Sequence, residues 1–131
     1  MNPTSVDICA MLEAESSLGL VFAENLFVGS EPAEPDDVVT VYDTPGRAPQ
    51  VTSKYGENYF YPSVQIRVRS NRYLDGWELI NKIKLVLHNR PQQTWNSTLY
   101  SSIVCTGDPF LLEWDENRRA CFVANFNIQR R

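Results

Sequence analysis

The alternation of apolar and polar residues changes its period near the middle of the chain. Between residues 59 and 70 the two kinds of side chain alternate, a period of two that predicts a β-strand. Its apolar face consists of Val64, Ile66 and Val68. Its opposite face carries Gln65, Arg67 and Arg69. The pattern therefore predicts one strand with a buried face and a basic face.

Directly after Ser70 the apolar positions take up helical spacing. The stripe is formed by Tyr73, Trp77, Ile80, Ile83 and Leu87. This spacing predicts an amphipathic helix that ends near His88 and covers one face of the sheet. We expect Trp77 to lie in the core beneath it.

Turn residues and apolar runs define the remaining elements. Thr4 is expected to cap a short first helix, which Gly19 ends. Further strands are predicted at residues 20–29, 38–42, 99–106, 110–114 and 119–128. Residues 45–57 contain prolines and glycines without periodicity, and are predicted to form a long exposed loop that orders against a neighbouring subunit.

This order of elements predicts one α+β domain spanning residues 1–131. We expect an antiparallel or mixed sheet that ends in a three-strand meander, with one long and one short helix packed on it. The predicted core where helix meets sheet is Val64, Ile66, Val68, Trp77, Ile80, Ile83, Phe122, Ala124 and Phe126.

Charge is distributed unevenly along a chain whose net charge is −4. Residues 1–57 contain ten acidic and two basic residues, whereas residues 58–131 contain six acidic and ten basic residues. An acidic patch on one copy could therefore meet a basic patch on another. Two independently solvated faces would give the same pattern, so charge alone leaves both interpretations open.

Composition and cysteine usage favour a domain that folds in a cytoplasm. The chain is 43% hydrophobic and 21% charged, and its first residues lack the features of a signal peptide. No apolar run approaches the roughly 20 residues of a bilayer span. Cys9, Cys105 and Cys121 are odd in number, and Cys9 and Cys121 are expected to be buried free thiols.

The sequence offers no constellation typical of catalysis. His88, the single histidine, is expected to interact with the last carbonyl groups of its helix rather than activate a nucleophile. The acid pairs Asp36/Asp37 and Asp115/Glu116 are interpreted as solvated turn residues. No phosphate-binding loop is present. We predict no enzymatic activity, no metal and no cofactor.

The basic residues allow one further interpretation. Arg67 and Arg69 share a strand face, Arg72 follows, and Tyr59 and Tyr61 have the same parity. Arginines beside aromatic rings on a sheet are typical of nucleic-acid platforms. A subunit contact surface would look the same, and the acidic net charge argues against a dedicated nucleic-acid binder.

Several segments together resemble a known family. They are Asn25–Gly29 followed by Pro32 and Pro35–Asp36, Val41–Gly46, Tyr61–Arg69, Gly107–Pro109 and Asp115–Arg119. In this order they resemble the phage and prophage minor capsid proteins, which are similar to the tail terminators of long-tailed phages. The resemblance covers nearly the whole chain.

The resemblance implies a structural virion protein that is assembled in the host bacterial cytoplasm. Such proteins form a hexameric ring that caps the tail tube, stops its polymerisation and joins the head connector. Implied partners are further copies of the chain, the tail tube protein and the connector or stopper protein, with DNA only as passing cargo and no membrane. Another neck component, such as a head-completion protein, is an alternative.

The resemblance assigns no residues to the contact, so these are predicted from charge and exposure. The predicted subunit or tube interface is Asp36, Asp37, Arg47, Lys54, Tyr55, Tyr59, Tyr61, Arg67, Arg69 and Arg72.

Overall fold

The computed structural model describes residues 1–51 and 58–131, and these form two α-helices, a 3-10 helix and a seven-stranded sheet. In chain order the elements are α1 (Thr4–Ala14), η1 (Ser16–Leu18), β1 (Leu26–Val28), β2 (Val38–Val51), β3 (Asn58–Ser70), α2 (Tyr73–Leu87), β4 (Gln93–Trp95), β5 (Thr98–Cys105), β6 (Phe110–Trp114) and β7 (Ala120–Arg130). The predicted α+β class, with one longer and one shorter helix, is confirmed.

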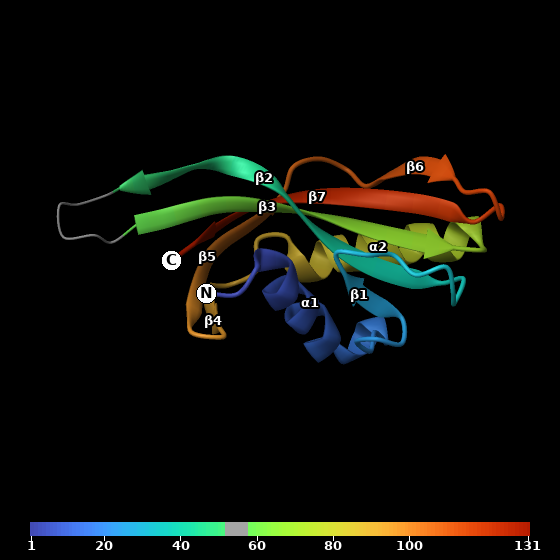
Figure 1. The fold of residues 1–131 in the computed structure, drawn as a ribbon, viewed down its shortest axis with the longest axis horizontal. Coiled ribbons are helices and arrows are strands. Elements are labelled where there is room, and N and C mark those ends of the chain that lie inside the picture. The colour runs from blue at the N-terminus through green and yellow to red at the C-terminus, as the bar shows by residue number, and fades with distance from the viewer. Residues whose placement is uncertain (52–57) are drawn as a thin grey trace.

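The sheet is mixed, with the order β1-β2-β3-β7-β5-β4 and β6 also beside β7 (Figure 1). β1 runs parallel to β2, and the other pairs are antiparallel. β6 pairs with residues 120–123 of β7, and β5 pairs with residues 126–130. The predicted meander is therefore wrong, because β5 and β6 lie end to end along β7. β4 was not predicted from the sequence.

Both helices cover the same face of the sheet, which we call the inner face (Figure 1). α1 packs on β1, β2 and β3, whereas α2 packs on β3, β5 and β7. The predicted core residues are buried there with the exception of Trp77. The alternation of β3 is thus confirmed, because its apolar residues point towards the helices and its arginines point to the opposite, outer face.

The predicted stripe of α2 is wrong in its first turn. Trp77 is 38% exposed and Tyr73 is 45% exposed, whereas Gly76 is buried. A Cβ atom at Gly76 would lie 2.9 Å from a ring carbon of Phe122, so glycine lets the helix approach the sheet closely here. The rings of Tyr73 and Trp77 consequently pack around Phe122, with centroids 5.1 and 5.9 Å from its own.

The N-terminal elements also differ from the prediction. Pro3 is the N-cap of α1, and Thr4 is buried in the first turn instead of capping it. α1 ends at Ala14, and Gly19 follows η1 in the left-handed conformation. Within the predicted strand 20–29 only Leu26–Val28 forms a full strand, because the Asn25 side chain binds the backbone of Val21 and Gly19 and holds a turn.

The predicted loop 45–57 is a strand over its first part. β2 continues to Val51 and pairs with β3, with register shifts on either side of Arg47. At Gly46 the two strands come so close that a Cβ atom would lie 1.8 Å from the Tyr61 carbonyl oxygen. We call residues 44–51 and 58–63 the arm, which projects beyond the helices (Figure 1). The rest of the predicted loop lies outside the described residues.

Candidate interaction surfaces

The predicted contact residues fall into two groups, one where β2 begins and one on the arm. The first group contains Asp36, Asp37, Arg67, Arg69 and Arg72. The second contains Arg47, Tyr59 and Tyr61. Lys54 and Tyr55 lie outside the described residues. The structure thus separates residues that the sequence treats as one surface.

Arg69 holds the segment that precedes β2. Its guanidinium donates hydrogen bonds to the backbone carbonyls of Pro32, Ala33, Pro35 and Asp36 over 2.6–3.4 Å, and also binds a Glu31 carboxylate oxygen at 3.1 Å. We call residues 31–37 the acidic segment. Because Arg69 is only 3% exposed, these contacts replace its hydration, and the acidic segment is fixed on the outer face of the sheet.

Two more arginines extend this cluster. Arg67 pairs with Glu31 at 2.9 Å and with Glu113 of β6 at 3.0 Å. Arg119 pairs with Asp115 at 2.7 Å and with Asp36 at 3.3 Å. Desolvation alone raises the pKa of Asp115, but the hydrogen bonds from Arg119 and the Asn117 backbone, together with the charge of Arg119, outweigh it and hold that pKa below its ordinary value. Acidic residues of the first half of the chain thus neutralise basic residues of the second half within one subunit.

This arrangement bears on the contact role predicted for Arg67 and Arg69, which stays a prediction. Arg69 is buried and Arg67 is partly buried and doubly paired, so both guanidinium groups are already engaged within one subunit. Charge reversal at Arg69 would disturb the fold before any subunit contact. Asp37, whose side chain accepts a hydrogen bond from the Asn71 backbone, and Arg72 remain exposed. Of the three arginines in the platform expected of a nucleic-acid binder, Arg67 and Arg69 are thus engaged within the subunit.

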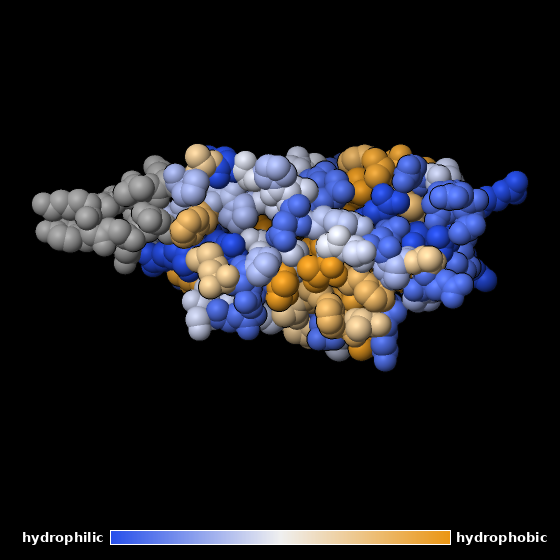
Figure 2. Space-filling model, in the orientation of Figure 1, coloured by the Kyte–Doolittle hydropathy of each residue, from blue (hydrophilic) through white to orange (hydrophobic). Residues whose placement is uncertain are grey.

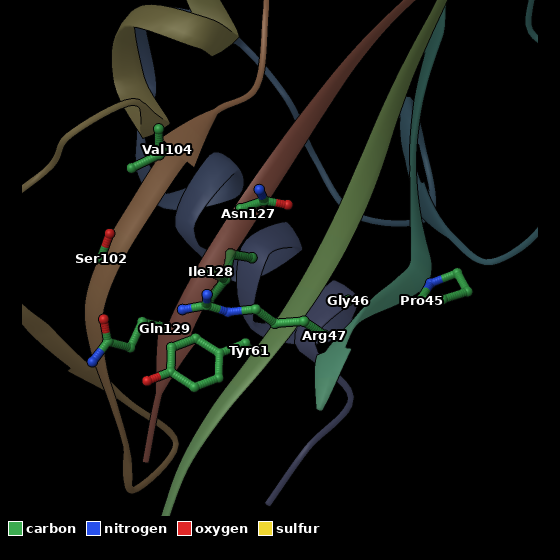
Figure 3. A pocket seen from close by; sticks show the side chains of 9 residues that line it. All are labelled: Pro45, Gly46, Arg47, Tyr61, Ser102, Val104, Asn127, Ile128 and Gln129. Carbon is green, nitrogen blue, oxygen red and sulfur yellow. The ribbon is translucent and has the colours of Figure 1, made fainter. Parts of the chain in front are cut away.

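The arm borders an open groove of about 530 Å³ on the outer face (Figure 3). Arg47 leaves β2 and crosses β3, so that its guanidinium carbon lies 4.0 Å from the centroid of the Tyr61 ring. Asn127 and Gln129 of β7 form the floor, and Ser102 of β5 lies at the opposite side. Beside the groove, Arg131 lies over the Tyr59 ring at 5.2 Å. Arginine and neutral donors therefore meet in one accessible depression.

Two apolar surfaces were not predicted as contacts. One lies over α1 and β1, where apolar side chains gather (Figure 2). Its apolar residues are Val6, Cys9, Ala10, Phe22 and Val28, and Glu13 is its charged member. The other lies at the edge strand β6, where Trp114 stacks on Tyr73 with ring centroids 5.9 Å apart and Phe110 and Leu112 are half exposed. Four of the five residues at 110–114 are apolar, more than one buried strand face needs, and this excess could have predicted the second surface.

A buried carboxylate joins the two ends of the chain. Asp7 is fully buried in α1, and accepts hydrogen bonds from the Tyr100 hydroxyl and, at 2.6 Å, from the Asn96 amide. Arg130 of β7 completes the network, since it donates to the Tyr100 oxygen at 3.2 Å. Burial and the bond to Asp7 raise the pKa of Tyr100. The apolar neighbours of Asp7 in α1 could have signalled its burial.

The histidine and cysteine residues, which were considered as candidates for catalysis or metal binding, make contacts that stabilise the fold. The Nδ1 atom of His88 accepts a hydrogen bond from the Cys105 backbone at 2.9 Å, so the expected contact with helix carbonyls is replaced by one that joins α2 to β5. Cys9 and Cys121 are buried free thiols, as predicted, and burial raises the pKa of Cys9 to about 11. Within residues 1–51 and 58–131, no group of three or more His, Cys, Asp or Glu side chains could hold a metal ion.

No helix among the described residues has the length and apolarity to cross a bilayer.

The comparisons with known proteins concern both fold and family. A chain in the solved structure of the virion of a native gene transfer agent particle has the same fold, with a TM-score of 0.69 over 98% of this chain and 94% of that one. At 11% identity, this likeness lies in the fold. A search of curated proteins finds no match. The family model for bacteriophage tail terminator proteins matches residues 10–131, and the chain belongs to this family of structural tail proteins.

Proposed function

We propose that this protein is a tail terminator that forms a hexameric ring on the head-proximal end of a phage tail tube. The ring stops polymerisation of the tube and provides the surface on which the head connector docks. The observation that carries this proposal is the match of the tail terminator family to residues 10–131, nearly the whole chain. The number six rests on the resemblance to tail terminators.

The surface of the subunit supports assembly into a ring. Cyclic rings use two different patches that meet around the rotation axis. The apolar surface over α1 and the aromatic edge at β6 are distinct exposed patches of this kind. Exposed apolar patches bordered by polar residues are typical of protein contacts. A net charge of −4 suits a ring through which DNA passes without being held.

In this proposal the protein acts through binding and not through catalysis. Its partners are further copies of itself, the tail tube protein and the head-tail connector or stopper protein. It needs no cofactor, and it joins the tail or neck of a virion in the host bacterial cytoplasm. The ion-paired arginine cluster supports a structural role, because its charges stabilise a surface segment.

Removal of this protein from the producing phage or prophage tests the proposal. Tails are then imaged by electron microscopy, and their length distribution is compared with that of the parent. We expect overlong tubes, which also lack heads, because nothing stops polymerisation or joins the connector. A plasmid copy of the wild-type gene should restore uniform, joined tails.

Two other outcomes decide against the proposal. Tubes of normal, uniform length that still carry heads would exclude a terminator. Tubes of normal length without heads would favour a different neck component, such as a head-completion protein.

A further inference from the structure

We propose that the groove beside the arm is a carboxylate-binding site, and that its occupant is the acidic segment of a second copy of this chain. The contact would join Arg47 of one subunit to Glu34 and Asp36 of the next. This inference rests on the proposed ring and specifies one contact within it.

The groove presents donors that the subunit itself does not use. Arg47 is in contact with the Tyr61 ring at 4.0 Å but forms no ion pair with any described residue. The side chains of Asn127, Gln129 and Ser102 also have no hydrogen-bond partner within residues 1–51 and 58–131. A guanidinium beside amide and hydroxyl donors matches the acceptors of a carboxylate. Tyr61 holds the guanidinium in place, which reduces the entropy lost on binding.

The acidic segment presents carboxylates that are similarly available. Glu34 is exposed and has no partner in the described part of the chain. Asp36 contacts Arg119 at 3.3 Å, yet 58% of its side chain remains exposed. Arg69 already fixes the backbone on both sides of Glu34 through the carbonyls of Ala33 and Pro35. The segment is therefore ordered before it meets a partner.

Distance along one strand excludes the same contact within a single subunit. The acidic segment ends immediately before β2 at Val38, whereas Arg47 lies nine residues further along that strand. A strand rises about 3.3 Å per residue, so the two features are roughly 30 Å apart. Only a second copy can bring them together. The resulting contact joins two different patches head to tail, as a ring requires.

Chemical cross-linking between introduced cysteines tests the contact directly. Glu34→Cys and Arg47→Cys are introduced together in a Cys105→Ser background, because Cys105 is the native thiol that is not buried. The long side chains of an arginine–glutamate pair hold their backbones too far apart for a direct disulfide bond, so a flexible bis-maleimide is used to bridge the two cysteines. The protein is treated with this reagent both alone and bound to tail tubes, and then run on a denaturing gel. We expect a ladder of covalent oligomers. The matched control pairs Glu34→Cys with Lys82→Cys, an exposed position on α2, and should give only monomer.

Charge exchange gives an independent readout of the same contact. Arg47→Glu or Glu34→Arg alone should weaken association between copies at least tenfold, about the effect of placing like charges together. The double exchange should restore most of it, and raised salt should reduce the difference. Lys82→Glu changes the net charge equally and should leave association unchanged.

The outcomes separate this inference from the proposed function. If rings form on tubes but the cysteine pair gives no ladder and Arg47→Glu associates normally, the groove contact is wrong and the terminator proposal stands. If tails that lack the protein are normal and carry heads, the terminator proposal is wrong. A ladder with loss and rescue in the exchange variants supports the contact.

Discussion

The two ends of the sheet's outer face use arginine in different ways. Where β2 begins, Arg67, Arg69 and Arg119 are engaged by carboxylates and carbonyls of their own subunit. On the arm, Arg47 is exposed, and its contact with Tyr61 leaves the guanidinium facing an open groove. Arginine side chains lie on the outer face at both ends. Burial decides whether such a charge serves folding or remains available to a partner.

The burial of Arg69 implies the largest effect on stability. Arg69→Ala removes the donors for four carbonyls and leaves the Glu31 carboxylate with one partner fewer. We expect a loss of about 3–5 kcal/mol in the free energy of unfolding, the cost of breaking a buried charged network. Urea denaturation measures it. Arg118→Ala, at an exposed position in the turn before β7, should change it by less than about 0.5 kcal/mol. A loss below about 1 kcal/mol at Arg69 would contradict our account.

The arm should depend on the close approach at Gly46. In Gly46→Ala the new methyl group would overlap the Tyr61 carbonyl, so β2 and β3 must move apart. We expect a loss of about 1–3 kcal/mol, typical of overpacking. Faster amide exchange in the arm should accompany it, while the arginine cluster stays protected. Gly107→Ala is the control, since nothing lies within 4 Å of a Cβ atom there. Unchanged stability and amide exchange in the arm would show that the pairing of β2 with β3 does not require the close approach at Gly46.

Arg47 should contribute little to folding, in contrast to Arg69. Its described contact is a cation–π interaction at an exposed site, so Arg47→Ala should cost at most about 1 kcal/mol. The same urea experiment compares the two arginines side by side. Equal losses at both positions would remove the distinction between the two ends.

Lowering the pH should reduce the free energy of unfolding through the Arg119–Asp115 pair, by a smaller amount than the substitutions above. The folded state lowers the pKa of Asp115, so its contribution to stability is present above the unfolded value of about 3.9 and is lost as pH falls through the lower folded value. Asp115→Asn should therefore flatten the acid limb of a stability-against-pH curve. An identical slope in the variant would argue that the Arg119 contacts do not favour the charged carboxylate.

Local periodicity predicted the elements whose own alternation of apolar and polar residues decides which face is buried. β6 was predicted at the residues it occupies, and the alternation of β3 placed its buried and outer faces correctly. Helical spacing also located α2, but not the rotation of its first turn. That rotation depends on how closely Gly76 approaches Phe122, which is distant in the sequence.

The candidate surfaces were harder to predict because they depend on long-range pairing. Arg67 and Arg47 are both basic residues near aromatic side chains in the sequence. Only the fold shows that Glu31 and Glu113 reach Arg67, whereas no described carboxylate pairs with Arg47. Prolines and a glycine at residues 45–49 suggested a loop, but register shifts let β2 accommodate them and continue. The sequence showed that the first half of the chain is acidic and the second half basic. It did not show that some of these charges pair with each other within one subunit.

The position of β7 has a consequence for how the polypeptide reaches its native state during synthesis. This strand comes after β3, β5 and β6 in the chain, yet it lies between them and pairs with all three. Translation delivers it after these three strands, at about 5–20 residues per second. Until β7 leaves the ribosome, the sheet lacks its central member and the earlier strands expose unpaired edges. The sheet therefore cannot be completed before β7 emerges from the ribosome, and the earlier strands are most prone to aggregate just before that moment.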